Sequence, residues 1–481
     1  MTSNSGSELR KIPLWIAGND VEPESGRYFD DMNPEDNTIY ARAAEGTSED
    51  IERAVHAASD AFAKYRLSLA KEREAWLIKA ADLLEQRADE CTDILIDEVG
   101  SPVGKARREI SQSVSILRAA AGSTRQVSGK TMPSDTAGRL SMSVRQPVGA
   151  VAAITPFNVP LAKGVRLTAS PLALGNTVVL LPSEEAPVMG QFLARLYADA
   201  GIPAGAFNVV SGFGAHIGDS LTCHPLVRVV TFTGSCSVGR HIQELCGRHG
   251  KRVTLELGGK SPLVIMADAD LNKAVPGAVH SVFAFQGQIC MAASRIYVER
   301  SILDEFTAKF SSAAQSLGFG DLRDAETVVG PIINDRQRNR VRSHIEDAIE
   351  KGATLITGGK WEGNRCQATI LADVTRDMEI YADETFGPVT SIYPVDSLDE
   401  AIDKSNDSVF GLSAGIYTSN IDSAMNFANN VQSGMVHINA PTAYAEPHVP
   451  FGGVGDSGFG REGTEVDIDL MTEWKWITLQ L

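Results

Sequence analysis

Short apolar runs alternate with helix-like stretches along most of the chain, and this alternation limits the folds available to it. Four runs lie between residues 148 and 232: Val148 to Ile154, Thr177 to Leu181, Ala206 to Val210 and Arg228 to Phe232. Three more follow residue 260: Pro262 to Met266, Arg295 to Val298 and Thr390 to Pro394. Strands that alternate with helices form parallel sheets covered by helices. The sequence therefore predicts two α/β domains that meet near residues 250–260.

The remaining segments follow other patterns. Residues 47–65 begin with Thr47 and Asp50 in a capping-box arrangement and continue with apolar residues at helical spacing, which predicts an amphipathic helix. Apolar and polar residues alternate from Arg139 to Arg145, and the terminal residues 474–479 are rich in strand-forming side chains. We expect both of these segments to be strands.

Composition limits the possible partners and location. The 481 residues are 43% hydrophobic and 22% charged, typical of a globular protein, and their length suggests about three units of roughly 150 residues. The net charge of −17 argues against nucleic acid and anionic membranes as partners. Six cysteines without paired spacing favour a reducing compartment, and neither a secretory leader nor a run of about 18 apolar residues is found. We expect a cytoplasmic protein without a metal, because the nine histidines show no ligand spacing.

Two glycine-bearing segments supply a carboxylate and a thiol. Glu256 opens the run ELGGKSP, and Cys290 ends the run FQGQIC. A cysteine attacks as its thiolate, and a neighbouring glutamate can deprotonate the water that releases a covalent acyl product. Taken alone, Cys290 could equally be a packed core residue and Glu256 a solvated carboxylate at a strand end. The pair becomes informative together with further motifs.

These two motifs, with others in the same order, resemble the signatures of the aldehyde dehydrogenase superfamily over about residues 12–480. The others are Thr155 to Asn158, Leu181 to Glu184, Phe232 to Ser235 with Gly239, Glu384 to Pro388 and Pro450 to Gly453. The resemblance implies two Rossmann-like parallel-sheet domains and a small β oligomerisation domain, in a homodimer or homotetramer. The implied bounds are 1–124 and 148–256 for the dinucleotide-binding domain, 257–455 for the catalytic domain, and 125–147 and 465–481 for the oligomerisation segments.

The resemblance also implies a reaction, the NAD(P)-dependent oxidation of an aldehyde to a carboxylic acid. Cys290 would attack the aldehyde to give a thiohemiacetal, whose oxyanion the Asn158 amide and the Cys290 N–H would stabilise. Loss of hydride would leave a thioester, which water activated by Glu256 would hydrolyse. The alternative for Asn158 is an ordinary turn residue before Pro160.

The cofactor site is predicted around a turn that leads into a helix. Residues 233–236 read as the turn and 237–246 as a helix that buries Val238, and the free amides of its first turn suit a pyrophosphate. Glu184 would accept hydrogen bonds from ribose hydroxyls and so favours NAD, unless it belongs to the first turn of the next helix. Leu181 replaces the lysine usual in relatives, so NADP stays possible. The candidate cofactor contacts are Thr155, Pro156, Phe157, Ser183, Glu184, Gly234, Ser235, Gly239, Leu257, Glu384 and Phe386.

The substrate class is predicted from the branch of the family that the chain resembles most. The segments 285–291 and 473–480 and the position of Arg166 are most similar to the benzaldehyde, vanillin and salicylaldehyde dehydrogenase branch, whereas Leu167 replaces a lysine common in relatives. We therefore expect an aromatic aldehyde. The candidate pocket residues are Ala162, Arg166, Ala284, Ile289, Met291 and Phe451. The alternatives are an aliphatic aldehyde or semialdehyde, a coenzyme A-acylating enzyme, a cysteine hydrolase, and a catalytically silent dinucleotide-binding or structural relative.

Overall fold

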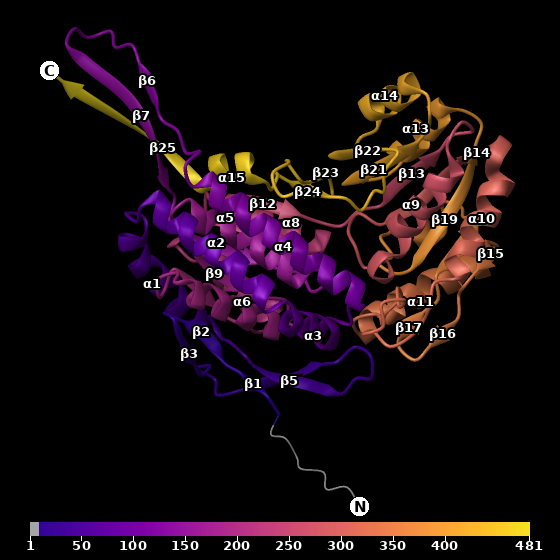
Figure 1. Cartoon of the computed structure of the whole chain (residues 1–481), viewed down its shortest axis with the longest axis horizontal. Coiled ribbons are helices and arrows are strands. Elements are labelled where there is room, and N and C mark those ends of the chain that lie inside the picture. The colour runs from indigo at the N-terminus through magenta and orange to yellow at the C-terminus, as the bar shows by residue number, and fades with distance from the viewer. Residues whose placement is uncertain (1–8) are drawn as a thin grey trace, which may run out of the picture.

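The computed structural model describes residues 9–481 as two α/β bodies and a projecting β arm (Figure 1). The first body is built on an eight-stranded sheet in the order β24-β12-β11-β8-β9-β10-β2-β3. The five strands from β12 to β10 are parallel to one another. The pairs β24–β12, β10–β2 and β2–β3 at the two edges are antiparallel. The bounds are β2 (Leu14–Ile16), β3 (Asn19–Val21), β8 (Ala150–Ile154), β9 (Thr177–Leu181), β10 (Phe207–Val209), β11 (Val227–Thr233), β12 (Arg252–Glu256) and β24 (Gly458–Phe459).

Helices cover both faces of this sheet. Apolar residues of α1 (Ser48–Tyr65), α7 (Gly214–Cys223) and α8 (Cys236–Arg248) pack on one face. Those of α5 (Pro160–Ala173) and α6 (Pro187–Ala200) pack on the other, with α2 (Ala70–Gln86), α3 (Ala88–Val99) and α4 (Val103–Ser123) outside them. Below lies a three-stranded sheet of β1 (Lys11–Ile12), β5 (Ile39–Ala44) and β4 (Tyr28–Met32).

The second body is a seven-stranded sheet in the order β15-β18-β19-β14-β13-β21-β22, parallel except for β15. Its strands are β13 (Ser261–Ile265), β14 (Ala293–Glu299), β15 (Thr354–Thr357), β18 (Thr369–Ala372), β19 (Val389–Val395), β21 (Ser413–Tyr417) and β22 (Met435–Ile438). Helices α9 (Leu271–Phe283) and α10 (Leu303–Gln315) cover one face; α11 (Asp335–Glu350), α13 (Leu398–Asn406) and α14 (Ile421–Asn430) cover the other.

Short elements complete the chain. They are the 3-10 turns η1 (Ala284–Gly287) and η2 (Arg300–Ile302), helices α12 (Glu379–Ala382) and α15 (Thr464–Met471), and the pairs β16 (Trp361–Glu362) with β17 (Arg365–Cys366) and β20 (Phe410–Gly411) with β23 (Val454–Gly455). The arm consists of β6 (Lys130–Met132), β7 (Arg139–Pro147) and β25 (Thr472–Gln480). Figure 1 shows the arm extending away from the first body, with the C-terminus near its outer end.

The predicted α/β class is confirmed, and each of the seven predicted apolar runs overlaps a strand. Residues 47–65 form α1, and its capping box joins Thr47 and Asp50 as expected. The prediction that Val238 is buried was wrong, because its side chain is 46% exposed. Val238 belongs to the first turn of α8, whereas the buried residues Ile242 and Cys246 follow one and two turns later. No helix in residues 9–481 has both the length and the apolar character needed to span a membrane.

Candidate active site

Cys290 lies in a tight loop between the two sheets. The backbone before it turns through Phe285 and Gln286, both in the left-handed region with φ of 48° and 45°. The Gln286 side chain secures this turn: its Nε2 donates to the Pro331 carbonyl at 2.8 Å, and its Oε1 accepts from the Gly330 N–H at 3.2 Å. Strained backbone that is held in place from outside is typical of functional sites. The thiol is therefore presented by a loop of fixed shape, and its side chain is half-buried.

Glu256 is the last residue of β12, in register with Thr233 on β11. Residues 257–260 then lead from the first sheet into β13 of the second. The carboxylate is 2% exposed, and neither of its oxygens has a hydrogen-bond partner within residues 9–481. Gly452 lies directly against it, because a Cβ at that position would be 2.5 Å from Glu256 Oε1. Glu256 is thus a buried base without a partner, which is unusual outside functional sites.

The same connection brings Glu256 to the cysteine loop. A Cβ added at Gly259 would lie 2.5 Å from the Cys290 carbonyl oxygen, so the two backbones are in contact. Asn158, just before α5, is 5% exposed and donates from Nδ2 to the Gln288 carbonyl at 2.8 Å. An amide has a second N–H to donate. The structure therefore places the three predicted catalytic residues around one loop, although they are far apart in the sequence.

A buried ion pair near these residues was not predicted from the sequence. Lys163 Nζ donates to Glu462 Oε2 at 2.7 Å, and Arg166 Nε lies 3.9 Å from the same oxygen. Both cations lie over the Phe451 ring, with Lys163 Nζ 4.7 Å and the Arg166 guanidinium carbon 5.8 Å from its centroid. The sequence signal was weak, because the residues belong to α5 and to the segment before α15, about 300 positions apart.

Burial controls the ionisation of the site. It raises the pKa of the Cys290 thiol to about 12, while the Lys163 ammonium opposes this effect and the carboxylates of Glu384, Glu256 and Glu462 add to it. Burial also raises the pKa of Glu256 well above its ordinary value; Glu462 reinforces this shift, and the cations Lys163, Arg461 and Arg166 oppose it. A carboxyl group with a raised pKa is suited to proton transfer near neutral pH.

The predicted pyrophosphate turn has no room for side chains at its glycines. A Cβ at Gly234 would be 2.4 Å from the Phe232 ring, and one at Gly239 would be 2.4 Å from Leu257 Cδ2. Ser235 caps α8, accepting from the Val238 N–H at 3.5 Å, and α8 has no acidic residue in its first turn. Free amides at a helix start and glycines that keep the backbone bare suit a dinucleotide phosphate. These residues therefore fit the group that the sequence predicts.

Glu184 lies in the turn between β9 and α6, so it is not in the first turn of the helix, which begins at Pro187. Its carboxylate is half-buried and makes no hydrogen bond or ion pair with any side chain in residues 9–481, whereas neighbouring Glu185 accepts from Asn334 at 2.7 Å. Ser183 is half-buried beside it, and Leu181 is fully buried. A free carboxylate at the carboxyl end of a parallel strand is available to a ribose.

The second cofactor segment joins the same site. Glu384 Oε1 accepts from the Gly259 N–H at 3.0 Å, and a Cβ at Gly258 would strike its Oε2 at 2.4 Å. Phe386 makes an edge contact with Phe157, with ring centroids 6.0 Å apart. Gln337, which the sequence did not single out, donates to the Thr385 and Phe386 carbonyls at 2.8 and 2.9 Å. Thr155 and Pro156 follow β8, so the segments near 155, 258 and 384 meet at one place.

Among the predicted pocket residues, Ala162, Arg166 and Phe451 are buried and Ala284, Ile289 and Met291 are half-buried. Arg166 donates from Nη2 to the Glu446 carbonyl at 3.0 Å, which fixes the guanidinium away from solvent.

The sequence did not predict a cluster of Glu52, His56 and His224, in which both histidine Nε2 atoms lie 2.9 Å from the glutamate. His224 Nδ1 accepts from the Leu226 N–H at 3.2 Å, so its Nε2 bears the proton and faces Glu52 as a donor.

The fold is that of one protein family. A sequence model of the aldehyde dehydrogenase family matches residues 21–477. The chain belongs to this family. It is 39% identical to a vanillin dehydrogenase of Pseudomonas fluorescens over 98% of both chains, and 38% identical to a benzaldehyde dehydrogenase of Bacillus subtilis over 98% of this chain and 97% of the other. The protein is therefore an aldehyde-oxidising oxidoreductase.

Solved structures agree with the family. A salicylaldehyde dehydrogenase of Pseudomonas putida in complex with salicylaldehyde has a TM-score of 0.95 and 36% identity over 98% of both chains. An NADP-dependent enzyme of E. coli has a TM-score of 0.95 at 35% identity, covering 98% of this chain and 99% of the other. A betaine aldehyde dehydrogenase of Staphylococcus aureus with bound NAD+ has a TM-score of 0.94 at 30% identity, covering 97% and 96%. This protein therefore uses NAD or NADP as its cofactor.

Proposed function

We propose that this protein oxidises an aromatic aldehyde to its carboxylic acid, preferring NAD, with Cys290 as nucleophile, Glu256 as general base and Asn158 as oxyanion donor. The proposal rests mainly on one observation. Three segments that are distant in the sequence bring together the Cys290 thiol, the buried and unpaired Glu256 carboxylate, and the Asn158 amide, which is hydrogen-bonded to the cysteine loop. The substrate class is supported by relatives named for vanillin, benzaldehyde and salicylaldehyde.

In the first half-reaction the chain generates and stabilises charge at one carbon. The Cys290 thiol is protonated at neutral pH, so its proton must pass to water to give the thiolate before the sulfur attacks. The sulfur then adds to the aldehyde carbon, and the second Asn158 N–H with the Cys290 N–H stabilises the oxyanion. When bound, the oxidised nicotinamide supplies a positive charge that favours the thiolate and accepts the hydride.

In the second half-reaction Glu256 activates water. The water oxygen adds to the thioester carbon while Glu256 takes one of its protons. The carbon–sulfur bond then breaks with its electrons going to sulfur, which releases the acid. The raised pKa of Glu256 makes it a stronger base than an exposed carboxylate, and its burial between Gly452 and the cysteine loop fixes its position. This role argues against a coenzyme A-acylating enzyme, which would release the acyl group to another thiol.

The cofactor contacts divide along the dinucleotide. Gly234, Ser235 and Gly239 would hold the pyrophosphate at the start of α8, and the exposed Val238 there is free to contact the ligand. Thr155, Pro156, Phe157, Ser183 and Leu257 would line the crevice, Glu184 would bind one ribose, and Glu384 with Phe386 would bind the nicotinamide ribose. We accordingly assign residues 9–124 and 148–256 to dinucleotide binding and 257–455 to catalysis; residues 1–8 of the predicted domain lie outside the described residues.

The aromatic preference is supported by the wall of the proposed pocket. The small side chains of Ala162 and Ala284 leave space for a ring, and Phe451, stacked under Lys163 and Arg166, offers an aromatic surface. Ile289 and Met291 flank the nucleophile on either side in the sequence. A panel of benzaldehyde, vanillin, salicylaldehyde, hexanal and succinic semialdehyde, each assayed with NAD and with NADP, tests both preferences. We expect higher kcat/KM for the aromatic aldehydes with NAD; a best substrate among hexanal and succinic semialdehyde would overturn the substrate class.

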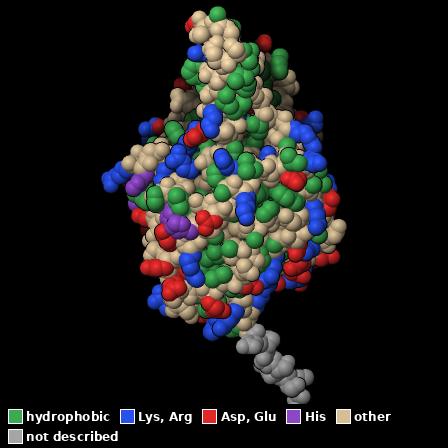
Figure 2. All heavy atoms as spheres, turned by 90° about the vertical axis from the view of Figure 1, so that its left-hand side faces the viewer, with side chains coloured by type: hydrophobic (Ala, Val, Ile, Leu, Met, Phe, Trp, Pro, Cys, Tyr) green, Lys and Arg blue, Asp and Glu red, His purple; other side chains and the backbone are tan. Residues whose placement is uncertain are grey.

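We further propose that the chain assembles through its arm, residues 125–147 and 465–481, into a homodimer or homotetramer. Figure 2 shows hydrophobic side chains gathered on this projection. Large apolar residues of its strands are exposed, with Trp476 at 68% and Leu479 at 51%. An apolar patch on a β sheet edge is typical of an interface. Light scattering should show a dimer or tetramer that Trp476→Glu weakens, and a wild-type monomer would contradict it.

All six cysteines are unpaired, which supports a reducing cytoplasm.

A further inference from the structure

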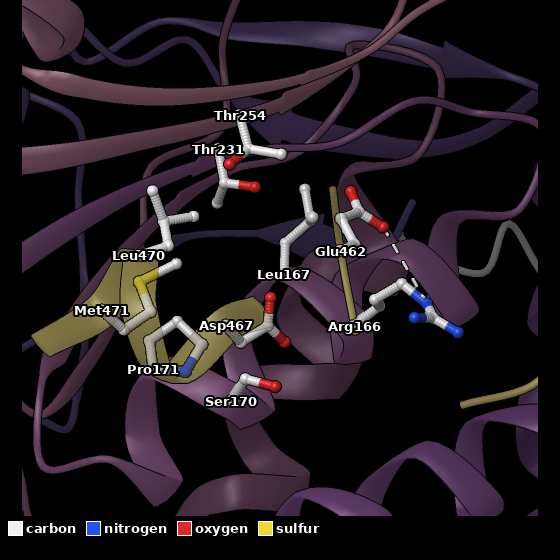
Figure 3. A pocket seen from close by; sticks show the side chains of 10 residues that line it. All are labelled: Arg166, Leu167, Ser170, Pro171, Thr231, Thr254, Glu462, Asp467, Leu470 and Met471. Carbon is white, nitrogen blue, oxygen red and sulfur yellow. Dashed lines mark ion pairs between the residues drawn. The ribbon is translucent and has the colours of Figure 1, made fainter. Parts of the chain in front are cut away.

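A small cavity, lined by both polar and apolar side chains, lies behind Glu256 on the side of the sheet that α5 covers. It has about 10 Å³ for the centre of a water molecule, which is room for about one. Figure 3 shows Thr231 and Thr254 on one side of it and Asp467 with Ser170 on the other. Thr231 and Thr254 are paired in register on β11 and β12, two residues before Thr233 and Glu256. Side chains two apart point to the same face, so the cavity is on the face of Glu256.

The electrostatic effect of Glu462 on Glu256 relates the base to this cavity. Glu462 lines the cavity and is the carboxylate that most strongly raises the pKa of Glu256. Its Oε2 is held by Lys163, but its Oε1 is buried without a partner within residues 9–481. An unpartnered buried oxygen beside a cavity of water size is suited to hydrogen bonding through a water.

Asp467 is the carboxyl group at the far side. It is on the inner face of α15, 6% exposed, whereas Glu465 and Asp469 on the same helix are exposed to solvent. Burial raises the pKa of Asp467 to about 7; Ser170, Arg166 and the Gly463 N–H oppose this shift and Glu462 adds to it. A group that ionises near neutral pH passes protons in both directions with little cost.

The reaction needs such a route because the base is enclosed. Glu256 gains a proton at each hydrolysis, yet both of its oxygens are out of contact with solvent. A proton on Glu256 must therefore leave through the protein before the next turnover.

We propose that Asp467 is the terminal acceptor of a proton path that starts at Glu256 and runs through Glu462 and the threonine-lined cavity. This rests on the proposed role of Glu256. The proton that Glu256 takes from water passes to Glu462 Oε1, crosses the cavity by way of a water held by the threonine hydroxyls, and reaches the Asp467 carboxylate. Asp467 is the last buried acceptor of the path, on the helix whose Glu465 and Asp469 are exposed to solvent. No bond other than those to the proton changes.

The test follows the decay of the acyl-enzyme, measured by mass spectrometry of quenched samples between pH 6 and 9. In the wild type the decay rate should rise through about pH 7 as Asp467 becomes a carboxylate. Asp467→Asn should lower the rate about 10-fold at pH 8 and abolish that rise, without changing the rate of acylation. Thr254→Val, which removes one cavity hydroxyl, should lower it in the same direction and increase the solvent isotope effect.

Glu465→Gln is the matched control, because Glu465 lies on the same helix, is exposed and makes no ion pair within residues 9–481, and this variant should match the wild type. Wild-type decay rates and pH profiles in both Asp467→Asn and Thr254→Val would overturn the path. If Asp467→Asn does not fold, Thr254→Val alone decides. A wild type that forms no acyl-enzyme would instead overturn the proposed function, so the two failures are distinct.

Discussion

Gly452→Ala tests the position of the base with a change of one carbon. The new Cβ would lie 2.5 Å from Glu256 Oε1, about 0.9 Å short of the 3.4 Å at which ordinary contact begins. The same Cβ would also lie 2.7 Å from Arg461 Cδ and 3.1 Å from the Gly460 carbonyl oxygen. The new methyl group therefore cannot move away from Glu256 in those directions. The carboxylate must therefore shift by about 1 Å, and a displacement of that size costs on the order of 100-fold in rate. We expect deacylation to slow by about this factor while acylation by Cys290 is little changed.

The assay is rapid-quench measurement of NADH and of acyl-enzyme, which separates the two half-reactions. Gly452 has a φ of +152°, so alanine also adds backbone strain. Gly352→Ala supplies the control, because Gly352 has a φ of +100° and nothing within 4 Å of its Cβ position. Wild-type deacylation in Gly452→Ala would refute the reasoning, and so would an equal loss in Gly352→Ala.

Three further outcomes follow from the site. Cys290→Ala should abolish turnover, while Glu256→Gln should slow deacylation by about 100-fold or more; steady-state kinetics showing wild-type rates in both would contradict the mechanism. Alkylation of Cys290 by iodoacetamide should keep rising from pH 6 to 9.5 in the free enzyme, because the thiol has a pKa of about 12, and NAD should lower its midpoint; a plateau below pH 8 without NAD would be inconsistent with this. Asp467 ionises at about pH 7 in the folded chain and near 4 when unfolded, so its contribution to stability is present at low pH and lost as the pH rises through 7. Asp467→Asn should therefore raise Tm relative to the wild type more at pH 8 than at pH 5 in a thermal melt, and an unchanged difference would show that Asp467 does not titrate there.

The sequence predicted what local patterns determine. Short apolar runs identified seven strands of the two large sheets, and Thr47 with Asp50 correctly predicted the start of α1. The motifs around Asn158, Glu256 and Cys290 were recognised because they resemble the signatures of the aldehyde dehydrogenase family and occur in the same order. The structure adds that these segments meet, which no local pattern contains.

The residues that the sequence missed act through contacts between distant segments. Lys163 on α5 looked like any helical lysine, and its pairing with Glu462 depends on how α5 packs against the chain before α15. Gln286 is a motif residue whose side chain turned out to hold the loop at Gly330 and Pro331. Val238 fitted the apolar stripe of α8 but belongs to its exposed first turn, because periodicity describes one helix and not what covers its end.

The most direct test of the central claim is peptide mass spectrometry of the Glu256→Gln variant, quenched during reaction with benzaldehyde and NAD. The account predicts a benzoyl group on the peptide that contains Cys290, at a level approaching one per active site. A benzoyl group on another cysteine, or NADH formation with no acyl adduct at Cys290, would contradict it.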